Sequence, residues 1–211
     1  MTPRDKVSLR RLSGPDLSHA LPALADLRIR VFAAYPYLYA GTTDYERDYL
    51  ETFASARDAF IVAAETSSGQ IVGCATGSAI TDHHDEFAAP LREAGIDLES
   101  TFYFGESVLL AGWRGHGIGH QFFDAREAHA RAHGYKATCF CAVDRPATHP
   151  DRPEDYSPLD SFWHKRGYFK RPGLVAHFDW PETPGGPSLP HEMHYWFHDL
   201  AQADATLPVD A

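Results

Sequence analysis

One stretch of the chain, residues 109–119, lies directly between a run typical of a β-strand and a run typical of a helix. It reads Leu109-Leu110-Ala111-Gly112-Trp113-Arg114-Gly115-His116-Gly117-Ile118-Gly119. Its last three glycines leave backbone N–H groups unobstructed, and a helix that begins there points unpaired N–H groups and its positive dipole end outward. A diphosphate can accept several such donors at once. The stretch therefore predicts an anion-binding turn.

Other glycine-rich turns fit this stretch less well. The Gly-Lys-Ser/Thr of a P-loop is missing, which speaks against nucleoside triphosphate hydrolysis. No acidic residue ends the next strand at the offset of a dinucleotide-binding fingerprint, because Asp144 comes too late. Two alternatives remain. In the first, the glycines of the turn serve only close packing of helix and strand; in the second, the turn belongs to an unrelated phosphate-ester enzyme.

The elements on either side of the turn form a β-α-β pattern. We expect a strand over 101–110, a helix over 117–133 and a strand over 137–143, joined by a right-handed crossover. Further strands are predicted over 7–12, 59–65, 70–80, 174–180 and 192–197. Further helices are predicted before Pro36, from about Thr43, over 82–95 and over 159–165. We interpret residues 1–200 as one α/β domain and 201–211 as a flexible tail.

Composition narrows the choice of partners and compartment. The 211 residues carry a formal charge of −10 and no lysine- or arginine-rich run, so a nucleic-acid partner is not expected, and a cationic substrate is favoured. No apolar run is long enough for a membrane span, and residues 1–6 lack the character of a signal peptide. Three cysteines suit free thiols in a reducing compartment. We therefore expect a cytoplasmic protein with no membrane partner.

The histidines and cysteines do not predict a metal site. His83-His84-Asp85-Glu86 is the densest group of such side chains, but adjacent histidines point in different directions and nothing nearby completes a ligand set. Cys139 and Cys141 alternate on one face of a strand and are interpreted as small apolar residues. No metal is expected.

The stretch Arg114 to Gly119 matches the R/Q-x-x-G-x-G/A signature of the GNAT N-acetyltransferase superfamily, which the chain resembles. The resemblance covers about residues 5–200 by the order of elements and 102–168 by motif. It implies a mixed, mostly antiparallel twisted sheet, flanked by helices, that opens into a V around acyl-CoA.

The resemblance also implies acetyl-CoA as the cosubstrate and assigns the residues that hold it. Arg114, Gly115, His116, Gly117, Ile118 and Gly119 would wrap the diphosphate, with His120 next in the same turn. Leu109 and Leu110 would pair their backbone with the amides of pantetheine, as a peptide pairs with a sheet edge. The family's late motif resembles residues 159–168, where Trp163 stands at the cofactor in place of a tyrosine that can protonate the leaving thiolate. Indole cannot supply that proton, and Asp144-Arg145-Pro146 replaces a frequent asparagine.

Glu106 is the predicted general base, because acyl transfer from a thioester requires a deprotonated amine. Simple alternation places it on one strand face with Phe104, Val108 and Leu110, unless a β-bulge shifts the register. The alternative is a carboxylate held in a structural ion-pair network.

The aromatic segment 35–41 would cover the acceptor side of the cleft, with Tyr37 and Tyr39 lining an amine pocket. The alternative is that these tyrosines anchor the loop on the core, as tyrosines of such loops often do.

The predicted activity is transfer of an acetyl group from coenzyme A to a primary amine of a small molecule, by direct attack in a ternary complex. A catalytically silent acyl-CoA-binding module is the alternative. Dimers are common among proteins that resemble this chain, so a homodimer stays open.

Overall fold

The computed structural model describes residues 6–83 and 85–201. Within them lie eight strands: β1 (Val7–Leu12), β2 (Phe60–Thr66), β3 (Ile71–Ala79), β4 (Thr101–Tyr103), β5 (Ser107–Leu109), β6 (Ala137–Val143), β7 (Phe169–Pro181) and β8 (Ser188–Asp199). The same residues form five α-helices: α1 (Gly14–Phe32), α2 (Thr43–Ser55), α3 (Asp85–Glu93), α4 (Ile118–Ala132) and α5 (Asp160–Lys165). None of these helices has the length and apolar character that a membrane span requires.

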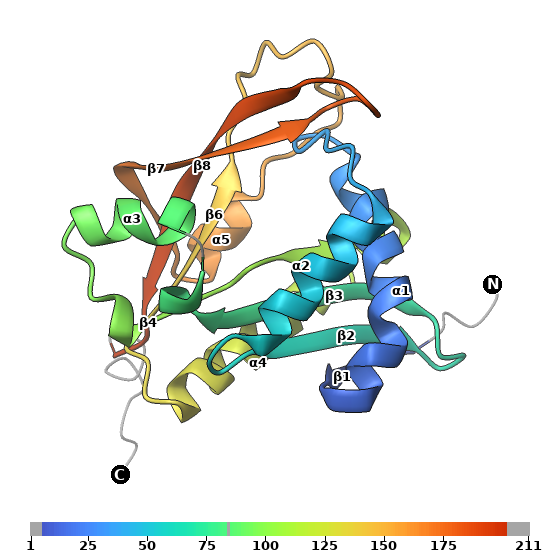
Figure 1. The fold of residues 1–211 in the computed structure, drawn as a ribbon, viewed down its shortest axis with the longest axis horizontal. Coiled ribbons are helices and arrows are strands. Elements are labelled where there is room, and N and C mark those ends of the chain that lie inside the picture. The colour runs from blue at the N-terminus through green and yellow to red at the C-terminus, as the bar shows by residue number, and fades with distance from the viewer. Residues whose placement is uncertain (1–5, 84, 202–211) are drawn as a thin grey trace.

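The strands form one open sheet in the order β1-β2-β3-β4-β6-β8-β7, with β5 paired to β3. The pairing of β4 with β6 is parallel, and the other pairings are antiparallel. The parallel pair arises because α4 carries the chain across the sheet between these strands. The predicted mixed, mostly antiparallel sheet and its β-α-β unit are confirmed. In Figure 1, β6, β8 and β7 run steeply away from β1, β2 and β3.

Helices cover both faces of the sheet, and their apolar stripes account for the core. Leu24 of α1 and Leu50 of α2 pack with Val108 on one face. Phe122 of α4 packs with Phe104 on the other face, where Trp163 of α5 joins the cluster. Figure 1 shows α1 and α2 together on one side, with α4 on the opposite side of β2 and β3. Because both faces are covered, β2 and β3 are apolar along almost their whole length.

The segment predicted as a single strand over 101–110 is divided at Phe104–Glu106. Gly105 donates its N–H to the Thr76 carbonyl at 3.2 Å, and the Glu106 N–H bonds Thr76 Oγ1 at 3.2 Å. This irregularity rotates the chain, so Phe104 packs beneath α4 while Val108 packs beneath α1. The prediction that Glu106 shares a face with Phe104 is therefore wrong, whereas Glu106 and Val108 both face α1 as predicted.

Element boundaries elsewhere agree with the sequence pattern or extend it. The strands at 7–12 and 137–143 are confirmed at both ends. The last two strands are longer than predicted, because β7 and β8 pair with each other as a long antiparallel hairpin. The predicted tail at 201–211 lies outside the described residues, apart from Ala201.

The break in the strand gives a first prediction. A Cβ at Gly105 would lie 2.5 Å from Thr76 Oγ1 and 2.7 Å from the Phe53 ring. Gly105→Ala should therefore lower the free energy of unfolding by about 1–3 kcal/mol, as overpacking does. Gly112→Ala, where the added methyl meets nothing within 4 Å, is the matched control. Urea denaturation of both variants measures the difference, and equal stabilities would contradict this account of the break.

Candidate active site

The sheet parts where the broken strand passes from β4 to β5. Phe104 still donates to the Cys139 carbonyl of β6 at 2.8 Å. Beyond that bond β5 pairs with β3, and β6 pairs with β8. The described ladders include no pairing of β5 with β6, so the two strands leave facing backbone edges open. This parting is the V-shaped splay that the resemblance implied.

Arg126 of α4 bonds the backbone at the position where β5 and β6 separate. Its guanidinium donates to the Glu106 carbonyl at 3.0 Å, the Thr76 carbonyl at 3.2 Å and Ser107 Oγ at 2.6 Å. The side chain is fully buried, and this burial lowers the pKa of Arg126 to about 10. A guanidinium at that pKa stays charged at neutral pH. It gives a second donor to the Thr76 and Glu106 carbonyls, which already accept the N–H groups of Gly105 and Thr76.

The backbone of β5 is accessible at Leu109 and engaged at Leu110. Leu110 donates its N–H to Val72 of β3 and accepts from Trp113, each within 3.0 Å. Because strand groups alternate in direction, the Leu109 N–H and carbonyl point away from β3, toward the parting. The Leu109 carbonyl accepts from Arg114 Nε at 3.3 Å.

The glycine turn has the open backbone that an anion-binding site needs. Gly115 and Gly117 have φ values of 77° and 80°, and an added Cβ at either would meet nothing within 4 Å. The first amide of α4 with a backbone acceptor in the described chain is that of Gln121, which bonds the Gly117 carbonyl. The N–H groups of residues 118–120 are thus left for a ligand. Their alignment with the helix axis favours negative charge.

The other predicted cofactor residues surround this turn. Arg114 and His116 are exposed, and His116 Nδ1 lies 3.2 Å from the Trp113 carbonyl. Ile118 is buried in the core and anchors the first turn of α4. Gly119 faces the Phe162 ring, against which His120 packs with ring centroids 4.9 Å apart. Trp163 lies one residue along α5, between Phe140 and Trp196. The structure therefore gathers these residues on the α4 side of the sheet.

Glu106 lies at the parting in a buried network of charges on the other face. Its Oε1 is 2.6 Å from Arg28 Nη1, and its Oε2 accepts from the Tyr49 hydroxyl at 3.3 Å. Arg28 also pairs with Glu46 through a short contact between Nε and Oε2. The three charged side chains are at most 8% exposed. One guanidinium thus serves two carboxylates, and the trio has a net charge of −1.

The surroundings of Arg28 and Tyr49 determine the protonation state of these two side chains. Burial alone would lower the pKa of Arg28, but the carboxylates of Glu106 and Glu46 raise it well above its ordinary value. Burial, and next the charge of Glu106, raise the pKa of Tyr49. Arg28 therefore stays charged and Tyr49 stays a donor, so both can orient the Glu106 carboxylate.

The two loop tyrosines have different surroundings. Tyr37 packs against Phe32 with ring centroids 4.7 Å apart, and the Arg28 guanidinium lies 5.1 Å from the centre of the same Phe32 ring. Tyr39 instead interacts with Glu46 through its hydroxyl. Tyr37 therefore lies next to the charged trio, separated from Arg28 by the Phe32 ring, whereas Tyr39 lies next to Glu46.

Arg28 and Glu46 were not among the predicted site residues, although the sequence carries a signal for both. Arg28 interrupts the apolar stripe of α1 between Leu24, Leu27 and Val31, and Glu46 occupies an inward position of α2. A charged residue on such a stripe needs a buried partner. The identity of that partner depends on contacts between separate elements.

Neither thiols nor metal ligands form a second reactive center in the described residues. Burial raises the pKa of Cys141 to about 12 and that of Cys139 well above its ordinary value, so both thiols stay protonated. No group of three His, Cys, Asp or Glu side chains among the described residues could hold a metal ion. His84, part of the histidine group considered above, lies outside the described residues.

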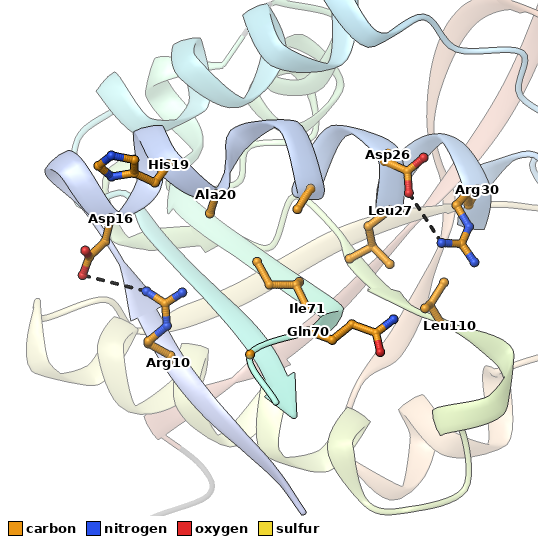
Figure 2. A pocket seen from close by; sticks show the side chains of 12 residues that line it. Arg10, Asp16, His19, Ala20, Asp26, Leu27, Arg30, Gln70, Ile71 and Leu110 are labelled. Carbon is orange, nitrogen blue, oxygen red and sulfur yellow. Dashed lines mark hydrogen bonds and ion pairs between the residues drawn. The ribbon is translucent and has the colours of Figure 1, made fainter. Parts of the chain in front are cut away.

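An open pocket of about 660 Å³ runs along α1, beside the turn between β2 and β3. Figure 2 shows its charged residues paired with one another, Arg10 with Asp16 and Arg30 with Asp26. Of the predicted site residues it includes Leu110. The pocket contains neither Glu106 nor the residues of the glycine turn 114–119, so it adjoins the candidate site at Leu110.

The sequence matches the model of the GNAT acetyltransferase family over residues 24–150, more than half of the chain. The chain belongs to this family. The matched segment contains the glycine turn, the parting of the strands and the charged trio. A search of curated proteins finds no match.

Solved structures with the same fold cover almost the whole chain. A GCN5-related N-acetyltransferase from Kribbella flavida is 15% identical, covers 90% of this chain and 97% of its own, and has a TM-score of 0.57. A GNAT-family acetyltransferase from Staphylococcus aureus is 10% identical, covers 92% and 99%, and has a TM-score of 0.61. The yncA protein of Salmonella typhimurium, solved with its cofactor acetyl-CoA, is 13% identical, covers 97% and 98%, and has a TM-score of 0.56. At these identities the likeness establishes the fold.

The buried trio gives a second prediction. Arg28→Met leaves two buried carboxylates without their counter-ion, so it should lower the free energy of unfolding by about 3–5 kcal/mol. Arg30→Met on the same helix removes an exposed pair with Asp26 and should cost less than about 1 kcal/mol. Chemical denaturation at neutral pH compares the two, and similar losses would contradict the tight burial of the trio.

Proposed function

We propose that the chain transfers an acetyl group from acetyl-CoA to a primary amine of a small molecule, by direct attack within a ternary complex. The open edge of β5, which lies between Glu106 and the glycine turn, is the observation that carries the proposal. Family membership supports the reaction class, and the bound acetyl-CoA of the yncA protein supports the cosubstrate. We assign the activity to residues 1–200 as one domain.

The residues at the turn fit the diphosphate of coenzyme A. The free N–H groups of residues 118–120 donate to its oxygens, and the open space at Gly115 and Gly117 admits them. Arg114 and His116 are exposed at the rim, where a positive side chain can accompany the anion. Pantetheine then extends along β5 and donates an amide N–H to the Leu109 carbonyl, as an added strand would. Leu110, whose N–H is already bonded to Val72, contributes apolar contact instead.

The chemistry follows from this placement of the thioester next to Glu106. Glu106 takes a proton from the ammonium group of the acceptor, and the freed nitrogen lone pair attacks the thioester carbonyl carbon. The Leu109 N–H donates to the oxygen on which negative charge develops. As the C–N bond forms, the C–S bond breaks, and the thiolate of coenzyme A leaves. The second proton lost by the acceptor nitrogen passes through water to this thiolate, which gives the amide and the coenzyme A thiol, and Glu106 releases its proton to solvent. Trp163 contributes packing beside the cofactor and no proton.

The charge of the site supports an amine as the acceptor. The trio of Arg28, Glu46 and Glu106 has a net negative charge in a buried setting, which attracts a cationic group that approaches along the cleft. Tyr37 lines this approach in the proposal, and Tyr39 supports Glu46 from behind. Cytoplasmic location remains part of the proposal.

Replacement of the proposed base gives a third prediction. Glu106→Gln should lower kcat for amine acetylation by about 100- to 10,000-fold, because the amide cannot accept the proton, while the Kd for acetyl-CoA changes little. Release of free coenzyme A is measured with a panel of tyramine, histamine, spermidine, glycine and glutamate. Glu65→Gln, at an ion pair with Arg10 on the far edge of the sheet, is the matched control.

Two outcomes of that experiment would contradict the proposal. Full activity of Glu106→Gln would remove Glu106 from the reaction. Binding of acetyl-CoA by the wild-type protein with no turnover of any amine in the panel would favor the catalytically silent module.

Replacement within the glycine turn gives a fourth prediction. Gly117→Ala should raise the Kd for coenzyme A by about 10- to 100-fold, because the methyl group projects into the space that the diphosphate needs. Gly95→Ala is the matched control, since Gly95 also has a positive φ, 74°, and open space at Cβ. Both variants carry a similar backbone strain. Isothermal titration calorimetry compares the two, and an equal affinity would place the diphosphate elsewhere.

A further inference from the structure

Arg145, two residues after the end of β6, has a buried guanidinium that joins three separate segments. Its Nε donates to the Pro36 carbonyl, and its Nη2 donates to the Tyr37 carbonyl at 3.0 Å. The same Nη2 lies 2.5 Å from Glu182 Oε1, beyond the end of β7. Its side chain is only 9% exposed. One side chain therefore connects the aromatic loop, the end of β6 and the β7–β8 hairpin.

The guanidinium of Arg145 is fully engaged within the protein, so it is not available to bind an anionic ligand. Each of its three nitrogens has a partner, since Nη1 lies 3.2 Å from His149 Nε2. Its positive charge is balanced by Glu182 at an ion-pair distance. A carboxylate of an acceptor molecule would have to displace these bonds. The geometry is that of a side chain that holds backbone in place.

The loop that Arg145 holds is tied to the hairpin at further points. The Tyr37 carbonyl also accepts from Trp180 Nε1 at 3.1 Å, and the Ala40 N–H donates to the Pro181 carbonyl at 2.9 Å. The Tyr37 ring stacks on Trp180, with centroids 6.1 Å apart. The position of Tyr37 thus depends on contacts with β7, and Arg145 is the charged member among them.

The side chain of Tyr37 carries this constraint to the candidate active site. Its ring packs on Phe32, and the Arg28 guanidinium that pairs with Glu106 lies 5.1 Å from the centre of the same Phe32 ring. Burial raises the pKa of Tyr37, so its hydroxyl stays protonated. Arg145 itself does not touch Glu106 in the described structure. Any effect of Arg145 on the acceptor therefore passes through the loop.

We propose that Arg145 is a positioning residue for the acceptor pocket: it fixes residues 36 and 37 so that the Tyr37 side chain forms the pocket wall beside Glu106. The inference rests on the proposed function for the identity of the ligand. It adds a determinant of acceptor binding that is distant from the coenzyme A turn. A change at Arg145 acts on the acceptor and leaves acetyl-CoA binding intact.

Steady-state kinetics of Arg145→Met tests this assignment, with the amine of the panel that the wild-type protein acetylates fastest. KM for the amine should rise by about tenfold or more, because small displacements of a binding group have large effects, while KM for acetyl-CoA stays within about twofold. Arg145→Lys keeps the charge near Glu182 but lacks the planar fork, so it should restore little. Arg166→Met is the matched control, a mostly buried arginine paired with Asp124 and Glu127 on the opposite side of the sheet. It should lower stability and leave KM for the amine unchanged.

A double-mutant cycle separates positioning from general damage. If Arg145 acts through Tyr37, the combined effect of Arg145→Met and Tyr37→Phe on KM for the amine should be smaller than the product of the single effects. Hydrogen exchange gives a readout that does not need turnover. Amides of residues 35–41 should exchange faster in Arg145→Met, and those of β3 should not. Should that variant fail to fold, Glu182→Gln, which removes the balancing carboxylate, should produce the same changes to a smaller extent.

The failure of this inference differs from failure of the proposed function. Equal changes in both KM values, independent effects in the cycle or unchanged exchange of residues 35–41 would overturn the role of Arg145 while wild-type acetylation stands. An absence of wild-type acetylation of every amine would overturn the proposed function, and the role of Arg145 in acceptor binding with it.

Discussion

Arg126 reaches from α4 to the carbonyls of Thr76 and Glu106, and this buried guanidinium holds open the point at which the sheet divides. Each of these carbonyls also accepts a backbone N–H, so Arg126 adds a second, charge-assisted hydrogen bond to both at the irregular junction of β4 and β5. Gly105 admits the close approach of Phe53 and Thr76 that the junction requires. The open edge of β5, the position of Glu106 and the access to the glycine turn all follow from this junction.

The same junction brings together two faces with different physical character. On the α4 side the turn offers uncharged N–H donors and a helix dipole, which suit an anion. On the α1 and α2 side the trio of Arg28, Glu46 and Glu106 offers a net negative charge, which suits a cation. A buried trio of this kind adds little stability compared with apolar residues of similar size. Its position beside the parting supports the proposed role of Glu106.

Local sequence features predicted the parts of the site that depend on local geometry. The glycine turn, the helix that follows it and the strand over 137–143 were all predictable, because alternation, helical periodicity and a glycine-rich helix start are properties of neighbouring residues. The sequence did not predict where along the strand the irregularity at Gly105 would fall. Its position depends on Thr76 and Arg126, which lie far away in the chain. The partners of Glu106 and the contacts of Arg145 with Pro36 and Glu182 likewise join residues 37 to 109 positions apart in the chain. Such contacts are decided by how the helices and the hairpin pack on the sheet.

An experimental structure of the protein in complex with acetyl-CoA tests the central claim most directly. The account predicts diphosphate oxygens within hydrogen-bond distance of the N–H groups of residues 118–120, pantetheine beside Leu109 in the parting of β5 and β6, and the thioester directed toward Glu106. Acetyl-CoA bound elsewhere, or β5 and β6 closed upon each other with the ligand excluded, would contradict it.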